Sequence, residues 1–171
     1  MTLSKARMIA DDFIAEFSPL CKRIEVAGST RREKPDDIKD VEIVIIPEAS
    51  KLIDLGGLIT SYGGKFPSKY TSFWYNGRAK IDLFTTTPEC WGCIYLIRTG
   101  SADFSKAIVT RAKRKDLAFL QGRLWGGGDM QALDTPEEAD VFKALGLAYI
   151  EPPKRIDSKS IAMAAGEFKK V

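Results

Sequence analysis

The spacing of apolar residues along the first half of the chain predicts a helix followed by two strands. Residues 4–17 carry apolar side chains such as Phe13 and Phe17 at helical spacing, which is typical of an amphipathic helix. Apolar and charged residues alternate over residues 22–27, and this period of two indicates a strand. Residues 41–46 form an almost unbroken β-branched run, which predicts a strand buried on both faces.

A β-hairpin gives the clearest local signal in this half of the chain. Asn76-Gly77 separates two β-prone runs, residues 71–75 and residues 78–84. A type I′ turn needs positive φ at both central positions, which asparagine and glycine tolerate best. We also expect a helix over residues 52–62, and a loop or short helical turn over the polar residues 30–39.

The second half of the chain is predicted to be more helical. We expect helices over residues 91–99 and 102–115, with Ser101 as the N-cap of the second helix. Residues 117–120 and 123–125 flank a Gln-Gly pair and are expected to pair weakly as strands.

A helix-start signature follows at Thr135. Threonine suits the N-cap, Pro136 suits the first helical position, and Glu138 would complete a capping box. This helix is expected to end near Gly146, and a last helix is expected over residues 158–168.

Together these elements predict an α+β fold in three parts. Residues 1–87 are expected to form a mixed β-sheet with flanking helices, and residues 88–155 a smaller, more helical carboxy-terminal lobe. Residues 156–171 are expected to form a tail that is helical in part.

The composition excludes several classes of protein. The chain has 171 residues, of which 44% are hydrophobic and 29% are charged, so it has enough apolar surface to fold as a globular protein. No apolar run approaches the roughly 20 residues that cross a bilayer, so we expect no membrane partner. Because the chain has no histidine, His-based catalysis and His-ligated zinc are excluded.

Charge and cysteine content narrow the picture a little further. The net charge is +3, and the whole excess lies in residues 91–171, partly in the run Arg111, Lys113, Arg114 and Lys115. Three cysteines are too few for a disulfide framework, so we expect a cytoplasmic protein. Cys90 and Cys93 have the spacing of a metal or redox half-site, but buried packing is the better interpretation without a second pair.

Three acidic residues interrupt otherwise apolar strands. Asp40 and Glu42 are two residues apart on one strand, so both side chains point to the same face. Asp82 interrupts the strand after the hairpin. If the two strands are neighbours, three carboxylates converge and need a compensating cation. Three oxygen donors without histidine or cysteine favour Mg²⁺ or Mn²⁺, and they suit a two-metal site for phosphoryl transfer.

A second pattern lies just before these acids. Gly28-Ser29 ends a strand and is followed by Arg31 and Arg32. Small residues at a strand end let the backbone approach a phosphate closely, and arginine can form paired hydrogen bonds with phosphate oxygens. The order of these motifs, with Asp-x-Glu flanked by β-branched residues, is far more specific than any one of them.

At this point the sequence resembles the nucleotidyltransferase superfamily, and within it the family X DNA polymerases typified by DNA polymerase beta. The resemblance covers roughly residues 24–155. It is carried by four patches in the right order, namely Gly28-Ser29-Thr30-Arg31-Arg32 with Asp40-Val41-Glu42, then Ile81-Asp82-Leu83, then Thr99-Gly100-Ser101 with Phe104, and finally residues 135–142 with Tyr149-Ile150-Glu151-Pro152.

The resemblance implies a polymerase palm followed by a carboxy-terminal lobe, and it assigns roles residue by residue. Asp40, Glu42 and Asp82 would bind two Mg²⁺ ions, with Mn²⁺ as a substitute, and Asp82 would help to deprotonate the primer 3′-hydroxyl. The nucleotide-binding residues would be Gly28, Ser29, Arg32, Thr99, Gly100 and Ser101. The DNA-binding residues would be Lys106, Arg111, Lys113, Arg114 and Lys115.

The implied substrates are a dNTP and gapped or primer–template DNA, the implied pathway is DNA repair, and a DNA ligase is a candidate partner of a monomeric enzyme. Three departures from the family pattern stand out. Glu42 replaces the usual aspartate, which affects metal spacing, and Arg98 replaces the usual aromatic residue, which affects sugar discrimination. Only one helix precedes the palm-like segment, so we expect a minimal form without the amino-terminal lyase domain and without lyase activity. Such economy is viral or phage-like, and a viral or phage enzyme would act in the host cytoplasm.

Two other functions stay open from the sequence. The same chemistry can transfer a nucleotide to RNA, protein or a small molecule, and a decayed site would leave a non-catalytic nucleic-acid-binding module. One further motif has two interpretations. Phe73, Trp74 and Tyr75 lie together in the predicted hairpin, and we interpret them as core residues in preference to a surface that stacks on bases.

Overall fold

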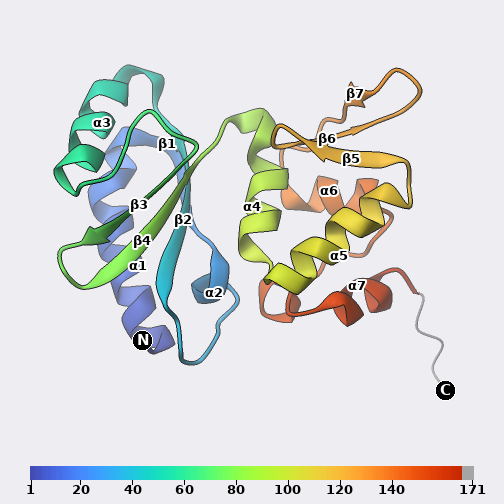
Figure 1. Cartoon of the computed structure of the whole chain (residues 1–171), viewed down its shortest axis with the longest axis horizontal. Coiled ribbons are helices and arrows are strands. Elements are labelled where there is room, and N and C mark those ends of the chain that lie inside the picture. Colours follow the sequence, from blue (N-terminus) through green and yellow to red (C-terminus); the bar gives the residue numbers. More distant parts are fainter. Residues whose placement is uncertain (167–171) are drawn as a thin grey trace. The chain divides into compact units, whose positions relative to one another are not determined.

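The computed structural model describes residues 1–166 and divides the chain into two compact units, the second of which begins at Pro88 (Figure 1). The first unit contains the mixed sheet and helices α1 to α3, and the second contains helices α4 to α7. Residues 167–171, which include the end of the helix expected over 158–168, lie outside the described residues.

The first unit is built on a four-stranded mixed sheet with the order β1-β2-β4-β3. β1 (Cys21–Val26) pairs antiparallel with β2 (Asp40–Pro47), and β2 pairs parallel with β4 (Ala79–Thr85). β3 (Tyr70–Tyr75) is the edge strand and pairs antiparallel with β4. The parallel β2–β4 contact brings together two segments that lie far apart in the sequence.

Two helices cover one face of this sheet. α1 (Leu3–Phe17) and α3 (Leu52–Ser61) bury their apolar faces against alternate residues of the strands in a single core (Figure 1). Val41, Ile43 and Ile81 belong to this core and are fully buried. Each such side chain contributes about 1.5–3 kcal/mol by leaving water. Because side chains alternate along a strand, the residues between them must lie on the opposite face.

The hairpin and the Gly28-Ser29 turn have the conformations that their sequences favour. Asn76 and Gly77 have φ values of 49° and 65°, which are the two positive values of a type I′ turn. α2 (Gly28–Arg31) is a single helical turn directly after β1, and the chain from Arg32 to Lys39 forms the irregular connection to β2.

The second unit packs helices around a small sheet. Its helices are α4 (Trp91–Thr99), α5 (Ala102–Lys113), α6 (Glu138–Ala144) and α7 (Ser158–Ala164). Its antiparallel strands are β5 (Leu117–Leu120), β6 (Arg123–Gly126) and β7 (Gln131–Ala132), a two-residue strand that the sequence did not reveal. Short 3₁₀ turns in the chain are Ser18–Leu20, Ala49–Lys51, Pro88–Cys90 and Pro152–Lys154.

The expected start of α6 is wrong by two residues. Glu137 is the N-cap, and its capping box is completed by Asp140, whose carboxylate accepts from the Glu137 N–H at 3.0 Å. Thr135 is buried instead, and its hydroxyl lies 3.5 Å from the Cys93 sulfur. Glu138 takes no part in the capping box, because its carboxylate forms a tertiary ion pair with a partner elsewhere in the unit.

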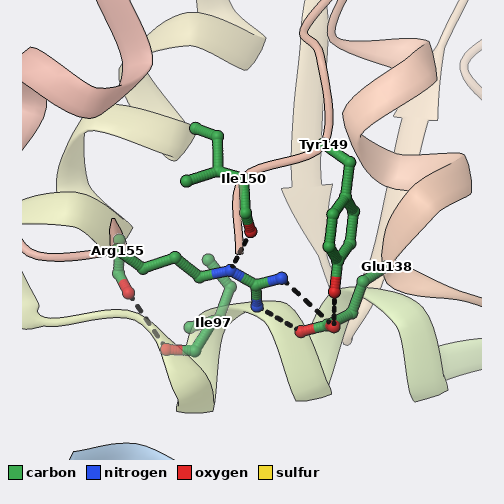
Figure 2. A network of polar contacts seen from close by, with 6 residues as sticks. Ile97, Glu138, Tyr149, Ile150 and Arg155 are labelled. Atoms are coloured by element: carbon green, nitrogen blue, oxygen red, sulfur yellow. Dashed lines mark hydrogen bonds and ion pairs between the residues drawn. The ribbon is translucent and has the colours of Figure 1, made fainter. Parts of the chain in front are cut away.

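That partner is Arg155, which is fully buried (Figure 2). Its guanidinium donates to both carboxylate oxygens of Glu138, at 2.5 and 3.3 Å, and its Nε donates to the Ile150 carbonyl at 2.8 Å. The Tyr149 hydroxyl donates to the same carboxylate at 3.4 Å. The Phe142 ring lies 5.2 Å from the guanidinium carbon. This network joins the segment after α6 to the start of α6 itself.

No helix within residues 1–166 is both long enough and apolar enough to span a bilayer.

We predict that Glu138→Gln destabilises the second unit by about 3 kcal/mol, because it leaves the buried Arg155 charge without its counterion. Urea unfolding of the full chain measures the effect. The exposed Glu151→Gln, which removes a carboxylate from the same segment, should change stability by less than about 0.5 kcal/mol. Equal stability of the two variants would show that the pair contributes nothing net.

Candidate active site

The three predicted carboxylates lie on one face of the first unit's sheet. The β2–β4 register pairs Glu42 with Asp82 and Asp40 with Lys80. Residues paired across neighbouring strands point to the same side, and the intervening Val41 and Ile81 point into the core. Asp40, Glu42 and Asp82 therefore occupy the face opposite to the helices.

Asp82 already has a compensating cation in its own strand. The Lys80 ammonium lies 3.0 Å from Oδ1 of Asp82, and the Tyr70 hydroxyl donates to the same oxygen at 3.1 Å. The hydrogen bond to Asp82 is the main reason that the pKa of Lys80 is raised. Two donors on one oxygen leave Oδ2 of this carboxylate free of those two contacts.

Glu42 packs against the Gly28-Ser29 turn. A Cβ atom on Gly28 would come within 1.5 Å of Oε2 and 2.4 Å of the carboxyl carbon of Glu42. Gly28 also has φ of +58°, a conformation that favours glycine. The turn is fixed to β2 by a backbone hydrogen bond from Ala27 N–H to the Glu42 carbonyl at 2.8 Å. Glycine is thus required here both for its backbone conformation and for the space that Glu42 fills.

Arg32 brings positive charge to the same turn. Its guanidinium donates to the Ser29 hydroxyl at 3.1 Å. Partial burial lowers the pKa of Arg32, and the nearby Glu42 carboxylate acts in the opposite direction. One local cluster is therefore formed by Gly28, Ser29, Arg32 and Glu42. It contains a guanidinium and a hydroxyl group that both suit phosphate oxygens, and it also contains a carboxylate.

The chemistry of the donor set fits a hard divalent cation, since all three side chains offer carboxylate oxygens. Within residues 1–166, however, no group of three or more acids, cysteines or histidines is close enough to form a ready metal site. The reason is visible in the contacts above, because Asp82 turns toward Lys80 and Tyr70 while Glu42 turns toward Gly28. The residues that would hold a metal ion at this face are Asp40, Glu42 and Asp82.

The other predicted nucleotide-binding residues connect α4 to α5 in the second unit. Thr99 is fully buried. Ser101 is the N-cap of α5, as predicted, accepts from the Phe104 N–H at 3.0 Å and donates to the Ile156 carbonyl. The Ser101 N–H donates to the Arg155 carbonyl at 3.1 Å, so the buried arginine also fixes this connection.

The predicted DNA-binding residues lie on α5 and just beyond its end. Lys106, Lys113, Arg114 and Lys115 are exposed. Arg111 is half-buried, and its Nε donates to the Leu145 carbonyl at 3.2 Å, so part of its hydrogen-bonding capacity serves the fold. A groove between α5 and α7 is lined by residues that include the basic Lys106, Arg111 and Arg114 and, on α7, Ser158.

The remaining candidates separate once their burial is known. Cys93 is buried, which raises the pKa of its thiol, and the Cys90 thiol lies 3.7 Å from the Gln121 carbonyl. The core interpretation of the aromatic run holds for Phe73 and Tyr75 but is wrong for Trp74, whose side chain is 64% exposed. Alternation along β3 is the cause, since Trp74 points away from the helices that cover its neighbours.

Two residues of the acidic face were missed by the sequence analysis. Lys80 was identifiable, because Lys-x-Asp on a strand places both side chains on one face. Tyr70 carried no local signal, since its contact with Asp82 depends on the β3–β4 register.

Comparison with known proteins adds independent information about both units. Residues 94–156 match the family model "DNA polymerase beta thumb". The chain is 34% identical over 86 residues to DNA polymerase lambda of Rattus norvegicus, a match that covers 44% of this chain but only 15% of that protein. It is 29% identical over 146 residues to Repair DNA polymerase X of African swine fever virus (isolate Pig/Kenya/KEN-50/1950), which covers 80% of this chain and 83% of the viral protein.

We predict that Gly28→Ala destabilises the first unit by more than the roughly 1–2 kcal/mol of a left-handed alanine, because Glu42 must also move. Gly77→Ala is the matched control, since φ there is +65° and nothing lies within 4 Å of the added Cβ. Urea unfolding measures both. In a Glu42→Ala background the cost of Gly28→Ala should fall to the Gly77→Ala level. If it does not fall, the tight contact between this carboxylate and the turn is refuted.

Proposed function

We propose that the chain is a family X DNA polymerase, which transfers a nucleotide from a dNTP to the 3′-hydroxyl of a DNA primer and so fills short gaps. The observation that carries this proposal is the common face of Asp40, Glu42 and Asp82 beside the Gly28-Ser29 turn. Filling a one-nucleotide gap leaves a nick, which is the substrate of a DNA ligase. A monomer is sufficient for this reaction.

Asp40, Glu42 and Asp82 would hold the two divalent ions that the family uses, for which Mg²⁺ is our proposal. Such ions stabilise negative charge on the attacking and leaving oxygens of an in-line displacement. Asp82 is proposed to accept the proton of the primer hydroxyl. Lys80 and Tyr70 both contact Oδ1 of Asp82, so Oδ2 is the oxygen proposed to accept the proton.

Ser29 and Arg32 are proposed to bind the β- and γ-phosphates of the incoming nucleotide. Their mutual hydrogen bond at 3.1 Å fixes the arginine side chain above the turn. The planar guanidinium carries five N–H donors, a geometry that suits phosphate oxygens. Partial burial strengthens these charge-assisted hydrogen bonds relative to those at a solvated surface.

The second unit is proposed to bind DNA through α5. The exposed cations Lys106, Lys113, Arg114 and Lys115 suit contacts with backbone phosphates, which give affinity without reading sequence. Sequence-independent binding is what a gap-filling enzyme needs. Thr99, Gly100 and Ser101 are proposed to lie beside the incoming nucleotide, on the strength of the family resemblance.

We predict that Asp82→Asn slows extension of a gapped primer by about 10³-fold, because the amide cannot accept the proton. Single-turnover extension with Mg²⁺ and the correct dNTP measures the rate, and thermal unfolding checks that the variant is folded. Asp54→Asn, which changes an exposed acid on α3, should extend at the wild-type rate.

Extension by folded Asp82→Asn at the wild-type rate would refute the proposed catalytic role. The same assay compares one-nucleotide-gapped DNA with single-stranded DNA, RNA and small hydroxyl acceptors. Preference for gapped DNA is expected, and preference for any other acceptor would assign the chain a different nucleotidyl transfer.

We predict that Lys113→Ala weakens DNA binding similarly for all sequences and reduces the slope of log K against log salt by about 1, the value for one lost phosphate contact. Fluorescence anisotropy of a labelled gapped duplex across a salt series measures the slope. Lys143→Ala, which removes an exposed lysine from α6, should leave the slope unchanged. An unchanged slope for Lys113→Ala would remove this residue from the DNA contact.

A further inference from the structure

The edge strand β3 contributes an aromatic residue to the acidic face of the sheet. Its register pairs Ser72 with Asp82 and Trp74 with Lys80. Tyr70, Ser72 and Trp74 therefore share the face of the carboxylates, while Phe73 is buried in the core on the other side. Two residues along a strand span about 7 Å, so Trp74 lies one such step from the position beside Asp82.

Trp74 has no visible role in holding the fold together. Its side chain is 64% exposed, and within residues 1–166 it makes no hydrogen bond and no ring contact. Tyr70 on the same face is different, because its ring lies 5.1 Å from that of Phe84 and its hydroxyl bonds to Asp82. A large aromatic side chain that stays in water beside a functional site indicates a binding surface.

The neighbourhood of Trp74 identifies the kind of ligand. Lys80, directly opposite in the register, has a side chain that is 41% exposed. An aromatic ring that packs on a base or sugar, next to an ammonium group that attracts phosphate, is the combination that binds a nucleic-acid strand. The centres of protein–protein interfaces are instead depleted in charged residues, whereas Trp74 pairs with Lys80, and Asp82 lies two residues further along the same strand.

We propose that Trp74 contacts the primer strand, with its ring packed against a base or sugar just upstream of the 3′ end. This inference rests on the proposed function, because the primer strand passes over β4 and β3 only if its 3′ end lies at Asp82. Lys80 then has two roles, since it forms an ion pair with Asp82 and lies beside the path of the strand. The edge of the sheet thus extends the site from the carboxylates to Trp74.

The test measures binding of a fluorescently labelled primer–template by the full chain, without dNTP. We expect Trp74→Ala to raise the dissociation constant about tenfold and Trp74→Phe to restore most of the affinity, because phenylalanine keeps an aromatic face. The matched control is Ile53→Ala, which removes a 91% exposed apolar side chain from α3 of the same unit and should leave the dissociation constant unchanged.

A second measurement uses the wild-type chain and so does not depend on a variant that folds. The chain has three tryptophans, and of the other two Trp91 is buried and Trp125 is half-buried. Acrylamide should therefore quench mainly Trp74 fluorescence, and saturating primer–template should protect it. Quenching that DNA leaves unchanged would overturn the proposal.

The outcomes separate this inference from the proposed function. If wild-type chain fills gaps while Trp74→Ala binds the primer–template as tightly as wild type, the role of Trp74 is refuted and the polymerase function stands. If Trp74→Ala instead converts a dimer to a monomer in sedimentation, the exposed face binds a second copy and the inference is overturned. If wild-type chain binds DNA through Trp74 but transfers no nucleotide to any primer, the proposed function fails alone.

Discussion

The parallel pairing of β2 with β4 is the constraint on which the first unit depends. It joins two strands from distant parts of the chain and sets Glu42 level with Asp82. Because side chains alternate, the same register buries Val41 and Ile81 under the helices and leaves the acids on the other face. A slip of one residue would bury the carboxylates and expose the core, so packing of the apolar face and assembly of the acidic face are one event.

Placing three acids on one face costs free energy, and the surrounding residues show how the chain offsets that cost. Lys80 and Tyr70 share Oδ1 of Asp82, and the Arg32 guanidinium lies near Glu42. These contacts place positive charge or a hydrogen-bond donor beside two of the three carboxylates.

The second unit relies on a different device. Within this unit the buried pair of Glu138 and Arg155 is hydrogen-bonded, and the guanidinium packs against the rings of Phe142 and Tyr149. Arg155 also accepts a backbone hydrogen bond from Ser101, at the start of α5. One buried arginine thus links the start of α6, the chain after Ile150 and the N-terminus of the helix that carries the exposed basic residues. The position of those basic residues is set by an interaction far from them in sequence.

Local sequence is enough to predict the features that a few neighbouring residues control. The type I′ turn at Asn76-Gly77, most helices and the common side of Asp40 and Glu42 follow from local conformational preference and strand alternation. The contacts and burial of three other residues depend on the tertiary structure. Glu138 looked like a capping residue but pairs with Arg155, Trp74 looked like core but is exposed, and Tyr70 reaches Asp82 only through the β3–β4 register. Each of these depends on which distant segments meet, and the free energy of that choice comes from packing over the whole unit rather than from any short run of residues.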